Sequence, residues 1–285
     1  MSRMLDYFVV DVFTTEAYAG NPLAVVPDAD GLSDGDLQRI ANEFNLSETA
    51  FPMAATVEGA SYRLRIFTPT TELPFAGHPS VGAAWVMRSL GRVGDGEVIQ
   101  ECGAGLLPLQ LDGDRVTLSG GEPSVSEPVD PAPVLAAVGL AATDFVGDAV
   151  RWAGAGLNWG FVHVHPDAVA RARPDTAALD AVAAGTGLSV FSYDDGVAHA
   201  RVFAGGAGVP EDPATGSAAL GFGVWLAATG LVLADGVTSY LIEQGVEIGR
   251  PSRLECTVRC VDGHPVELAV AGAVVPIAEG RIRVP

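Results

Sequence analysis

The chain contains nearly the same phrase twice. Residues 72–82 read ELPFAGHPSVG, and residues 211–221 read EDPATGSAALG. The Glu, the Pro and both Gly coincide at a constant spacing of 139 residues (211 − 72), and an apolar run with a Trp follows each copy. A spacing near half of the 285-residue chain indicates two homologous halves, because the repeats of a solenoid have far shorter periods.

The two copies differ at positions where polar chemistry is expected. His78 of the first copy corresponds to Ser217 of the second, and Leu73 corresponds to Asp212. Two equivalent helix N-termini that carry different polar residues predict one asymmetric site between two similar domains.

Length and composition agree with this division. The hydrophobic fraction of 48% describes a globular chain, and each half is large enough to bury its own core. We expect an N-terminal half at residues 1–122 and a C-terminal half at residues 123–285, with the last strand able to return to the N-terminal half. The segment Glu122–Pro133 carries four prolines and is the best candidate linker.

The charge and the cysteines exclude several classes of protein. A formal net charge of −19 argues against binding to nucleic acid or anionic membranes, and solubility explains it more simply. We expect neither a signal peptide nor a membrane span, because residues 1–20 carry three acids and no run of 18 apolar residues occurs. Cys102, Cys256 and Cys260 lack zinc-ligand spacing, which favours buried free thiols in a reducing cytoplasm.

Periodicity predicts mostly strands with a few helices. The alternation in Tyr62–Phe67 predicts a strand with one buried face, and Ser33 precedes a helical pattern that ends at Phe44. The apolar runs after the repeated phrases predict buried helices at residues 80–90 and 218–229. We expect another helix at 176–185 and strands at 6–13, 21–27, 50–56, 106–111, 116–118, 158–165, 190–192, 199–203, 239–244 and 253–261. This order predicts an α+β fold with two pseudo-symmetric halves, each a mostly antiparallel curled sheet around a central helix.

The starts of the two repeated helices are candidate binding sites. Gly77 and Gly216 each precede a polar residue, so backbone N–H groups can approach a ligand closely there. The helix dipole favours an anion such as a carboxylate or an enolate-like charge. The alternative is that these glycines only permit tight packing between helix and sheet.

The polar residues beside these glycines suit acid–base chemistry. His78 can donate a hydrogen bond or carry a proton. Asp212 can orient His78 or bind an ammonium group, and Ser217 can bind a ligand or simply cap its helix. Glu48 follows a helix and is flanked by apolar residues. A carboxyl in apolar surroundings can both give and take a proton, although residue type alone favours a surface loop glutamate.

Other reactive classes find little support. No nucleotide-binding fingerprint is present, and the glycine-rich stretch 205–208 opens no apolar helix. His163 and His165 lack a third metal ligand, and the context of Ser217 is not the Gly-x-Ser-x-Gly turn of a serine hydrolase.

Six stretches together resemble one known family. They are GNP at 20–22, NLSE at 45–48, RIFTP at 65–69, ELPFAGHP at 72–79, EDPATGS at 211–217 and QGVEIGRPS at 244–252. The set is similar to the PhzF family, the phenazine-biosynthesis isomerases within the diaminopimelate-epimerase-like fold.

The resemblance implies an active site in a cleft between the two halves, a homodimer, and no metal or organic cofactor. It implies isomerisation of trans-2,3-dihydro-3-hydroxyanthranilate by net proton movement across a conjugated system. The acid–base glutamate of the family falls on Glu48, its histidine on His78, its aspartate on Asp212 and its serine on Ser217. We also expect three further residues to bind the substrate, which are the glycines Gly77 and Gly216 and the amide residue Asn21.

Three functions therefore stay open. The first is a dihydro-hydroxyanthranilate isomerase of phenazine-type secondary metabolism and antibiotic biosynthesis. The second is a PhzF-like isomerase that acts on another small carboxylic acid. The third is a non-catalytic small-molecule binding protein. A two-cysteine racemase of the same fold is disfavoured, because His78 and Ser217 occupy the places of its thiols.

Overall fold

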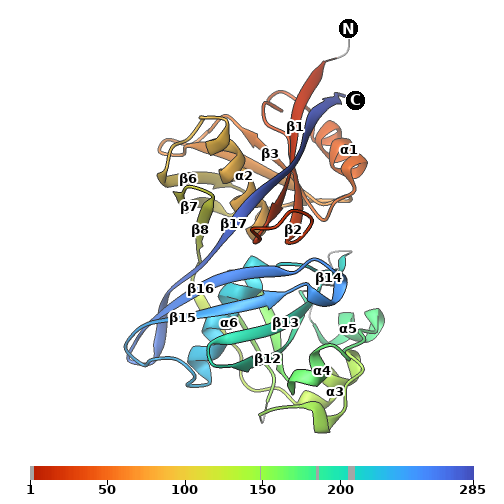
Figure 1. Cartoon of the computed structure of the whole chain (residues 1–285), viewed down its shortest axis with the longest axis vertical. Helices are drawn as coiled ribbons and strands as arrows, with labels where there is room; N and C mark the ends of the chain where they lie inside the picture. Colours follow the sequence, from red (N-terminus) through yellow and green to blue (C-terminus); the bar gives the residue numbers. More distant parts are fainter. Residues whose placement is uncertain (1–2, 148, 184–185, 205–208) are drawn as a thin grey trace. The chain divides into compact units, whose positions relative to one another are not determined.

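The chain forms two compact units. The computed structural model describes residues 3–147, 149–183, 186–204 and 209–285 (Figure 1). The first unit comprises residues 1–119 with 271–285, and the second comprises residues 120–270. The long final strand β17 (His264–Arg283) contributes residues to both units. The structure thus divides the chain after residue 119, where the sequence predicts a division after residue 122.

The elements follow one another mostly as strands. In the first unit they are β1 (Met4–Val12), β2 (Asn21–Val25), α1 (Asp34–Phe44), β3 (Thr49–Met53), β4 (Tyr62–Phe67), β5 (Glu72–Leu73), α2 (Gly77–Ser89), β6 (Gly96–Cys102), β7 (Gly105–Asp112) and β8 (Arg115–Ser119). In the second they are β9 (Pro123–Val125), α3 (Pro131–Ala137), β10 (Arg151–Ala155), β11 (Asn158–His163), α4 (Pro166–Val169), α5 (Thr176–Val182), β12 (Leu188–Asp194), β13 (Val197–Ala204), β14 (Val209–Asp212), α6 (Gly216–Ala228), β15 (Gly236–Gln244) and β16 (Ser252–Val261).

The two units repeat the same strand pairings in the same order. In the first, β1–β2, β3–β4, β4–β5 and β6–β7 are antiparallel, whereas β2–β3 and β4–β6 are parallel. In the second, β10–β11, β12–β13, β13–β14 and β15–β16 are antiparallel, whereas β11–β12 and β13–β15 are parallel. Each sheet is therefore mostly antiparallel, and the fold is α+β with two related halves, as the sequence predicts.

The final strand extends the sheet of the first unit. Residues Val274 to Arg283 of β17 pair with β1, with a shift of register between Val9 and Val10. In the second unit the short strand β9 pairs in the same antiparallel sense with β10.

A buried helix occupies the centre of each unit. Both α2 and α6 contain 13 residues, and their first residues are 139 positions apart (216 − 77). The helix α2 packs against β1, β2, β3, β4, β7 and β8, and α6 packs against β9, β10, β11 and β16 (Figure 1). Because both helices are apolar on nearly all sides, burial within a curled sheet is the arrangement that removes most of their surface from water.

The remaining helices cover the outer faces of the sheets. The helix α1 begins after Ser33, whose hydroxyl accepts from the N–H of Asp36 in a capping box, and it ends at Asn45 in the left-handed conformation. Its residues Leu37, Ile40 and Ala41 join a core cluster with Phe51 and Phe67. In the second unit α3, α4 and α5 contribute to a second cluster that includes Leu135, Val169 and Leu179.

Several sequence expectations need correction. The predicted linker Glu122–Pro133 contains β9 and the first turn of α3, where Asp130 caps the helix and Pro131 occupies a first-turn position. The central helices begin at Gly77 and Gly216, earlier than the apolar runs indicate. The helix predicted at 176–185 is α5, which ends at Val182. The glycine-rich stretch 205–208 lies outside the described residues.

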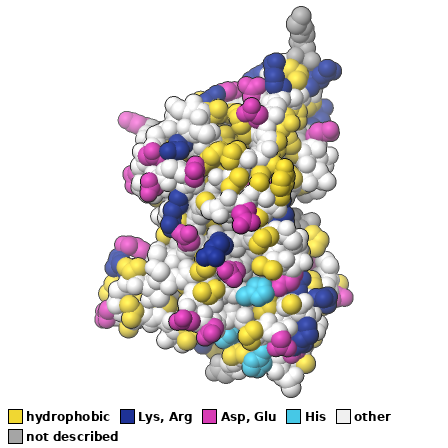
Figure 2. Space-filling model, viewed as in Figure 1, with side chains coloured by type: hydrophobic (Ala, Val, Ile, Leu, Met, Phe, Trp, Pro, Cys, Tyr) yellow, Lys and Arg dark blue, Asp and Glu magenta, His cyan; other side chains and the backbone are white. Residues whose placement is uncertain are grey.

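The acidic side chains do not gather on one patch of the visible face. Figure 2 shows them scattered among apolar and neutral side chains on that face. Within the described residues, no helix has both the length and the apolar character that a membrane span requires.

Candidate active site

The first unit brings Glu48 and His78 together. Glu48 lies in the loop that leads into β3, and His78 is the second residue of α2. The Nε2 atom of His78 lies 3.5 Å from Oε2 of Glu48, and the two side chains are only 5% and 15% exposed. Glu48 is thus a largely buried carboxyl group beside an imidazole, and the alternative of an exposed loop glutamate is wrong.

Burial keeps the imidazole neutral. Removal from water lowers the pKa of His78 from 6.5 to about 3, because the charged form loses its hydration. The contact with Glu48 is therefore not an ion pair at neutral pH, although the two atoms are within ion-pair distance. A neutral imidazole can donate to a carboxylate or accept from a carboxylic acid, so it suits a partner that changes its protonation state. The Nε2 atom is buried and makes no hydrogen bond to the described residues.

The start of α2 completes this group. Ala76 provides no side-chain cap, and Ser80 donates from Oγ back to the Ala76 carbonyl at 2.9 Å. The N–H groups of Gly77 and His78 therefore lack a side-chain cap, and Pro79 has no N–H to satisfy. Asn21, at the start of β2, accepts from the hydroxyl of Ser47, the neighbour of Glu48, at 3.4 Å.

The second unit presents Asp212 and Ser217 at the start of α6. Asp212 is the last residue of β14, and Ser217 lies in the first turn of α6. Thr215 precedes the helix but does not cap it, because its hydroxyl donates to Oδ2 of Asp212 at 2.6 Å. The first-turn N–H groups of α6 thus lack a side-chain cap, and this arrangement suits an anionic group of a ligand.

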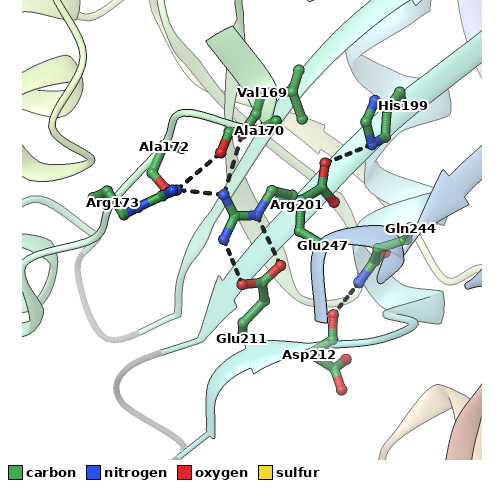
Figure 3. Close-up of polar contacts among 10 residues, drawn as sticks. All are labelled: Val169, Ala170, Ala172, Arg173, His199, Arg201, Glu211, Asp212, Gln244 and Glu247. Atoms are coloured by element: carbon green, nitrogen blue, oxygen red, sulfur yellow. Dashed lines mark hydrogen bonds and ion pairs between the residues drawn. The ribbon is translucent and has the colours of Figure 1, made fainter. Parts of the chain in front are cut away.

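Two buried residues hold these groups in place. Gln244, at the end of β15, donates to the Asp212 carbonyl at 2.7 Å (Figure 3). It also donates to the Thr215 hydroxyl at 3.0 Å. Trp159 of β11 donates from Nε1 to Oγ of Ser217 at 3.1 Å. From the sequence, Gln244 is recognised only as part of the stretch 244–252 that resembles the family, with no role assigned to it. Trp159 is not among the residues that the sequence predicts for the site.

A buried ion pair supports the segment that carries Asp212. Arg201 of β13 donates to both carboxylate oxygens of Glu211, at 2.9 and 2.7 Å, and to the carbonyls of Val169 and Ala172 (Figure 3). Its guanidinium also lies 5.0 Å from the ring centre of Phe203. The hydrogen bonds to Glu211 raise the pKa of Arg201 above its usual value, so the guanidinium stays charged.

The first unit has the same ion pair in a more exposed setting. Arg65 of β4 donates to both oxygens of Glu72 at 2.7 Å and lies 5.1 Å from the ring centre of Phe67. The pattern Arg-x-Phe followed by the Glu of the repeated phrase occurs in both halves of the sequence. This repeat was the signal that could have revealed both ion pairs.

The other candidate groups do not form a site. Among the described residues, no group of three His, Cys, Asp or Glu side chains is placed to hold a metal ion. The three cysteines are free, with Cys256 and Cys260 buried and Cys102 partly exposed. His163 stacks on Phe191 with ring centres 5.0 Å apart, and His165 lies just before α4 and not on the same strand.

Comparison with known proteins identifies the family of this chain. The sequence profile of the phenazine biosynthesis-like protein family matches residues 10–280. The chain belongs to this family. It is 37% identical to the trans-2,3-dihydro-3-hydroxyanthranilate isomerase of Pseudomonas aeruginosa, over 96% of this chain and 98% of that protein. It is 34% identical to an uncharacterized isomerase of Mesorhizobium japonicum, over 97% of this chain and 98% of that protein.

Solved structures of PhzF proteins share the fold. A PhzF-family protein of Bacillus anthracis superposes with a TM-score of 0.88 at 27% identity, over 98% of this chain and 99% of that one. A hydroxyproline epimerase of Agrobacterium vitis has the same fold, with a TM-score of 0.68 at 16% identity, over 100% of this chain and 94% of that one. The PhzF fold and the wider epimerase fold thus share the two-unit framework described above.

Proposed function

We propose that this chain is an isomerase that converts trans-2,3-dihydro-3-hydroxyanthranilate by moving a proton within the substrate. The observation that carries the proposal is the buried pair of Glu48 and neutral His78, 3.5 Å apart at the uncapped start of α2. The relative of Pseudomonas aeruginosa named for this reaction supports the choice of substrate.

Glu48 is the proton carrier in this proposal. Its carboxylate takes a proton from one substrate carbon and returns it to another, so the enzyme ends the cycle unchanged and the substrate is only isomerised. His78 stays neutral in this cycle. A neutral imidazole can donate to the Glu48 carboxylate or accept from the Glu48 carboxylic acid, so it suits both protonation states of Glu48. The first-turn N–H groups of Gly77 and His78 stabilise negative charge that develops on the substrate.

Asp212 and Ser217 of the second unit are substrate-binding residues in this proposal. The hydroxyl of Ser217 and the uncapped N–H groups of Gly216 and its neighbours donate hydrogen bonds to the substrate carboxylate, and Asp212 accepts a hydrogen bond from the substrate amine or hydroxyl. Asn21, which lies beside the Glu48 loop, adds a polar contact to the ring substituents. No step of this reaction uses a metal ion or an organic cofactor.

A second candidate is an isomerase for another small carboxylic acid. It is favoured by the relatives of Mesorhizobium japonicum and Pasteurella multocida, which are 34% identical and are named uncharacterized isomerases. The same residues would then move a proton in a different carbon skeleton. The homodimer and the cytoplasmic location stay predictions, drawn from the resemblance and from the composition.

Proton NMR in D2O tests the proposal. Wild-type protein and Glu48→Gln, which keeps size and shape but cannot exchange a carboxyl proton, are incubated with trans-2,3-dihydro-3-hydroxyanthranilate. We expect conversion by the wild type and a loss of at least about 100-fold in the variant. Folded wild-type protein that leaves the compound unchanged would contradict the proposed substrate. A variant with the full rate would contradict the role of Glu48.

A further inference from the structure

Asp212 and Ser217 are partly exposed groups in buried surroundings. The residues between them, Pro213 to Gly216, are all buried. A ligand that reaches this segment therefore meets these two side chains first. What they offer to the ligand depends on the hydrogen bonds that they already make to buried neighbours.

The hydrogen bond from Trp159 makes Ser217 a hydrogen-bond donor toward a ligand. An indole N–H is a donor only, so the Ser217 oxygen accepts in the 3.1 Å contact with Trp159 Nε1. Trp159 is 7% exposed, and a buried N–H that loses its acceptor is costly. The oxygen of Ser217 thus stays directed toward the indole, and its own proton remains to be donated, which suits a ligand group that accepts.

The hydrogen bonds of Gln244 and Thr215 make Asp212 a hydrogen-bond acceptor, which is the opposite of the donor role of Ser217. The Gln244 amide donates to the Thr215 hydroxyl at 3.0 Å and accepts from the Thr215 N–H at 3.3 Å, so both ends of the amide are engaged. The Thr215 hydroxyl must then direct its proton to Asp212 Oδ2, 2.6 Å away. Asp212 is held as an acceptor, which suits a ligand group that donates.

We propose that Trp159 and Thr215 are positioning residues that set Ser217 as a donor and Asp212 as an acceptor toward the ligand. Neither contacts the ligand itself. The inference rests on the proposed function for the location of the ligand. It adds the requirement that the ligand present an acceptor, such as a carboxylate, together with a donor, such as an amine or hydroxyl. The corresponding positions of the first unit, His78 and Leu73, provide no such opposed pair.

The first test compares two tryptophans by calorimetry with 3-hydroxyanthranilate, a stable aromatic compound that carries both kinds of group. Trp159→Phe keeps the ring but removes the N–H, and we expect roughly fivefold weaker binding. The matched control is Trp152→Phe. The Trp152 indole nitrogen is also buried but makes no hydrogen bond to the described residues, so we expect affinity within about twofold of wild type.

A double-mutant cycle separates positioning from a general effect on the fold. If Trp159 acts through Ser217, Trp159→Phe has no further effect on affinity in a Ser217→Ala background. The same logic applies to Thr215, for which Thr215→Val weakens binding roughly fivefold, Thr215→Ser restores it, and Asp212→Ala removes the difference between them. Far-ultraviolet circular dichroism checks that each variant is folded.

The outcomes distinguish this inference from the proposed function. Wild type that binds the compound but does not turn over the dihydro substrate would contradict the proposed reaction and leave the positioning roles standing. Equal affinities for Trp159→Phe and Trp152→Phe, additive losses in the cycles, or no binding of the compound by folded wild type would overturn the positioning roles.

Discussion

The two units share a framework but differ in which polar groups they bury. Both have the same strand pairings and a 13-residue central helix that begins with an uncapped turn. In the first unit the pair of His78 and Glu48 is largely buried, whereas the Arg65–Glu72 pair is partly exposed. In the second unit the Arg201–Glu211 pair is buried, whereas Asp212 and Ser217 are partly exposed.

A duplicated fold can therefore give its two halves different roles. Both units keep the N-terminus of the central helix in the same place. A few substitutions between the two repeated phrases decide which polar side chains lie at each N-terminus. In our account the first unit supplies a proton carrier kept from water, and the second supplies binding groups held by a buried network.

The largest effect should come from the two equivalent ion pairs. Glu211→Gln leaves Arg201 charged and buried, with side chains 8% and 11% exposed in the original pair, and should cost about 3 kcal/mol or more of unfolding free energy. Glu72→Gln should cost about 1 kcal/mol or less, because Glu72 is 42% exposed and Arg65 keeps Asp34 as a partner. Urea unfolding compares them. Equal losses would contradict the contrast in burial.

The next largest effect should be a change of the unfolding free energy with pH, caused by the buried imidazole of His78. Its pKa is about 3 in the folded protein and 6.5 as a reference, so the unfolded chain binds a proton that the folded protein does not. This contribution is fully present above pH 6.5 and is lost as the pH falls toward 3. Between pH 7.5 and pH 4 the loss of unfolding free energy through this group should be about 3 kcal/mol.

The matched control for His78 is His163. Burial also lowers the pKa of His163, but this side chain is only half-buried, so its contribution should be smaller. Urea unfolding between pH 7.5 and 4 should show that His78→Asn flattens the pH dependence more than His163→Asn does. The same flattening in both variants would show that His78 is not held neutral by burial.

The smallest effect should come from the second glycine of each repeated phrase. A Cβ at Gly221 would lie 2.8 Å from the backbone oxygen of Ala153, whereas a Cβ at Gly82 would lie 2.6 Å from Leu23 Cδ2, the end of a movable side chain. Gly221→Ala should therefore cost about 1–3 kcal/mol. Gly82→Ala should cost less, because its closest contacts are side-chain atoms of Leu23 and Val12 and because the gain in helix propensity of about 1 kcal/mol offsets part of the crowding.

Thermal melting measures both glycine variants. A larger loss for Gly82→Ala than for Gly221→Ala would show that α2 packs more tightly than α6 at this position, which is the opposite of what we expect. Either result bears on packing alone, since neither glycine belongs to the candidate site.

Local patterns predicted much of the framework. Ser33 and the apolar spacing after it predicted α1, and the alternation in Tyr62–Phe67 predicted β4 with its buried face. The strand β6 escaped prediction because GEVIQEC mixes polar and apolar residues. A last strand able to return to the N-terminal half was expected, but the range of β17 was not predicted, because Pro276 and two glycines interrupt its pattern. The starts of α2 and α6 were placed too late because Gly, His and Pro are weak helix formers.

The candidate site was predictable only in part. Glu48 and His78 were named from residue types and resemblance, but their contact joins segments 30 positions apart (78 − 48) and depends on tertiary structure. The same holds for Gln244 with Thr215 and for Trp159 with Ser217, whose hydrogen bonds span 29 and 58 positions. A single sequence carries no local signal for such pairs. The repeat of Arg-x-Phe before each Glu was the exception.

The most direct test of the division between the units measures kcat and KM of Glu48→Gln and Ser217→Ala on trans-2,3-dihydro-3-hydroxyanthranilate. Our account predicts that Glu48→Gln lowers kcat at least about 100-fold with little change in KM. It predicts that Ser217→Ala raises KM about fivefold and leaves kcat within about threefold of wild type. A Glu48→Gln enzyme with near-normal kcat, or a Ser217→Ala enzyme that loses kcat as severely, would contradict the division.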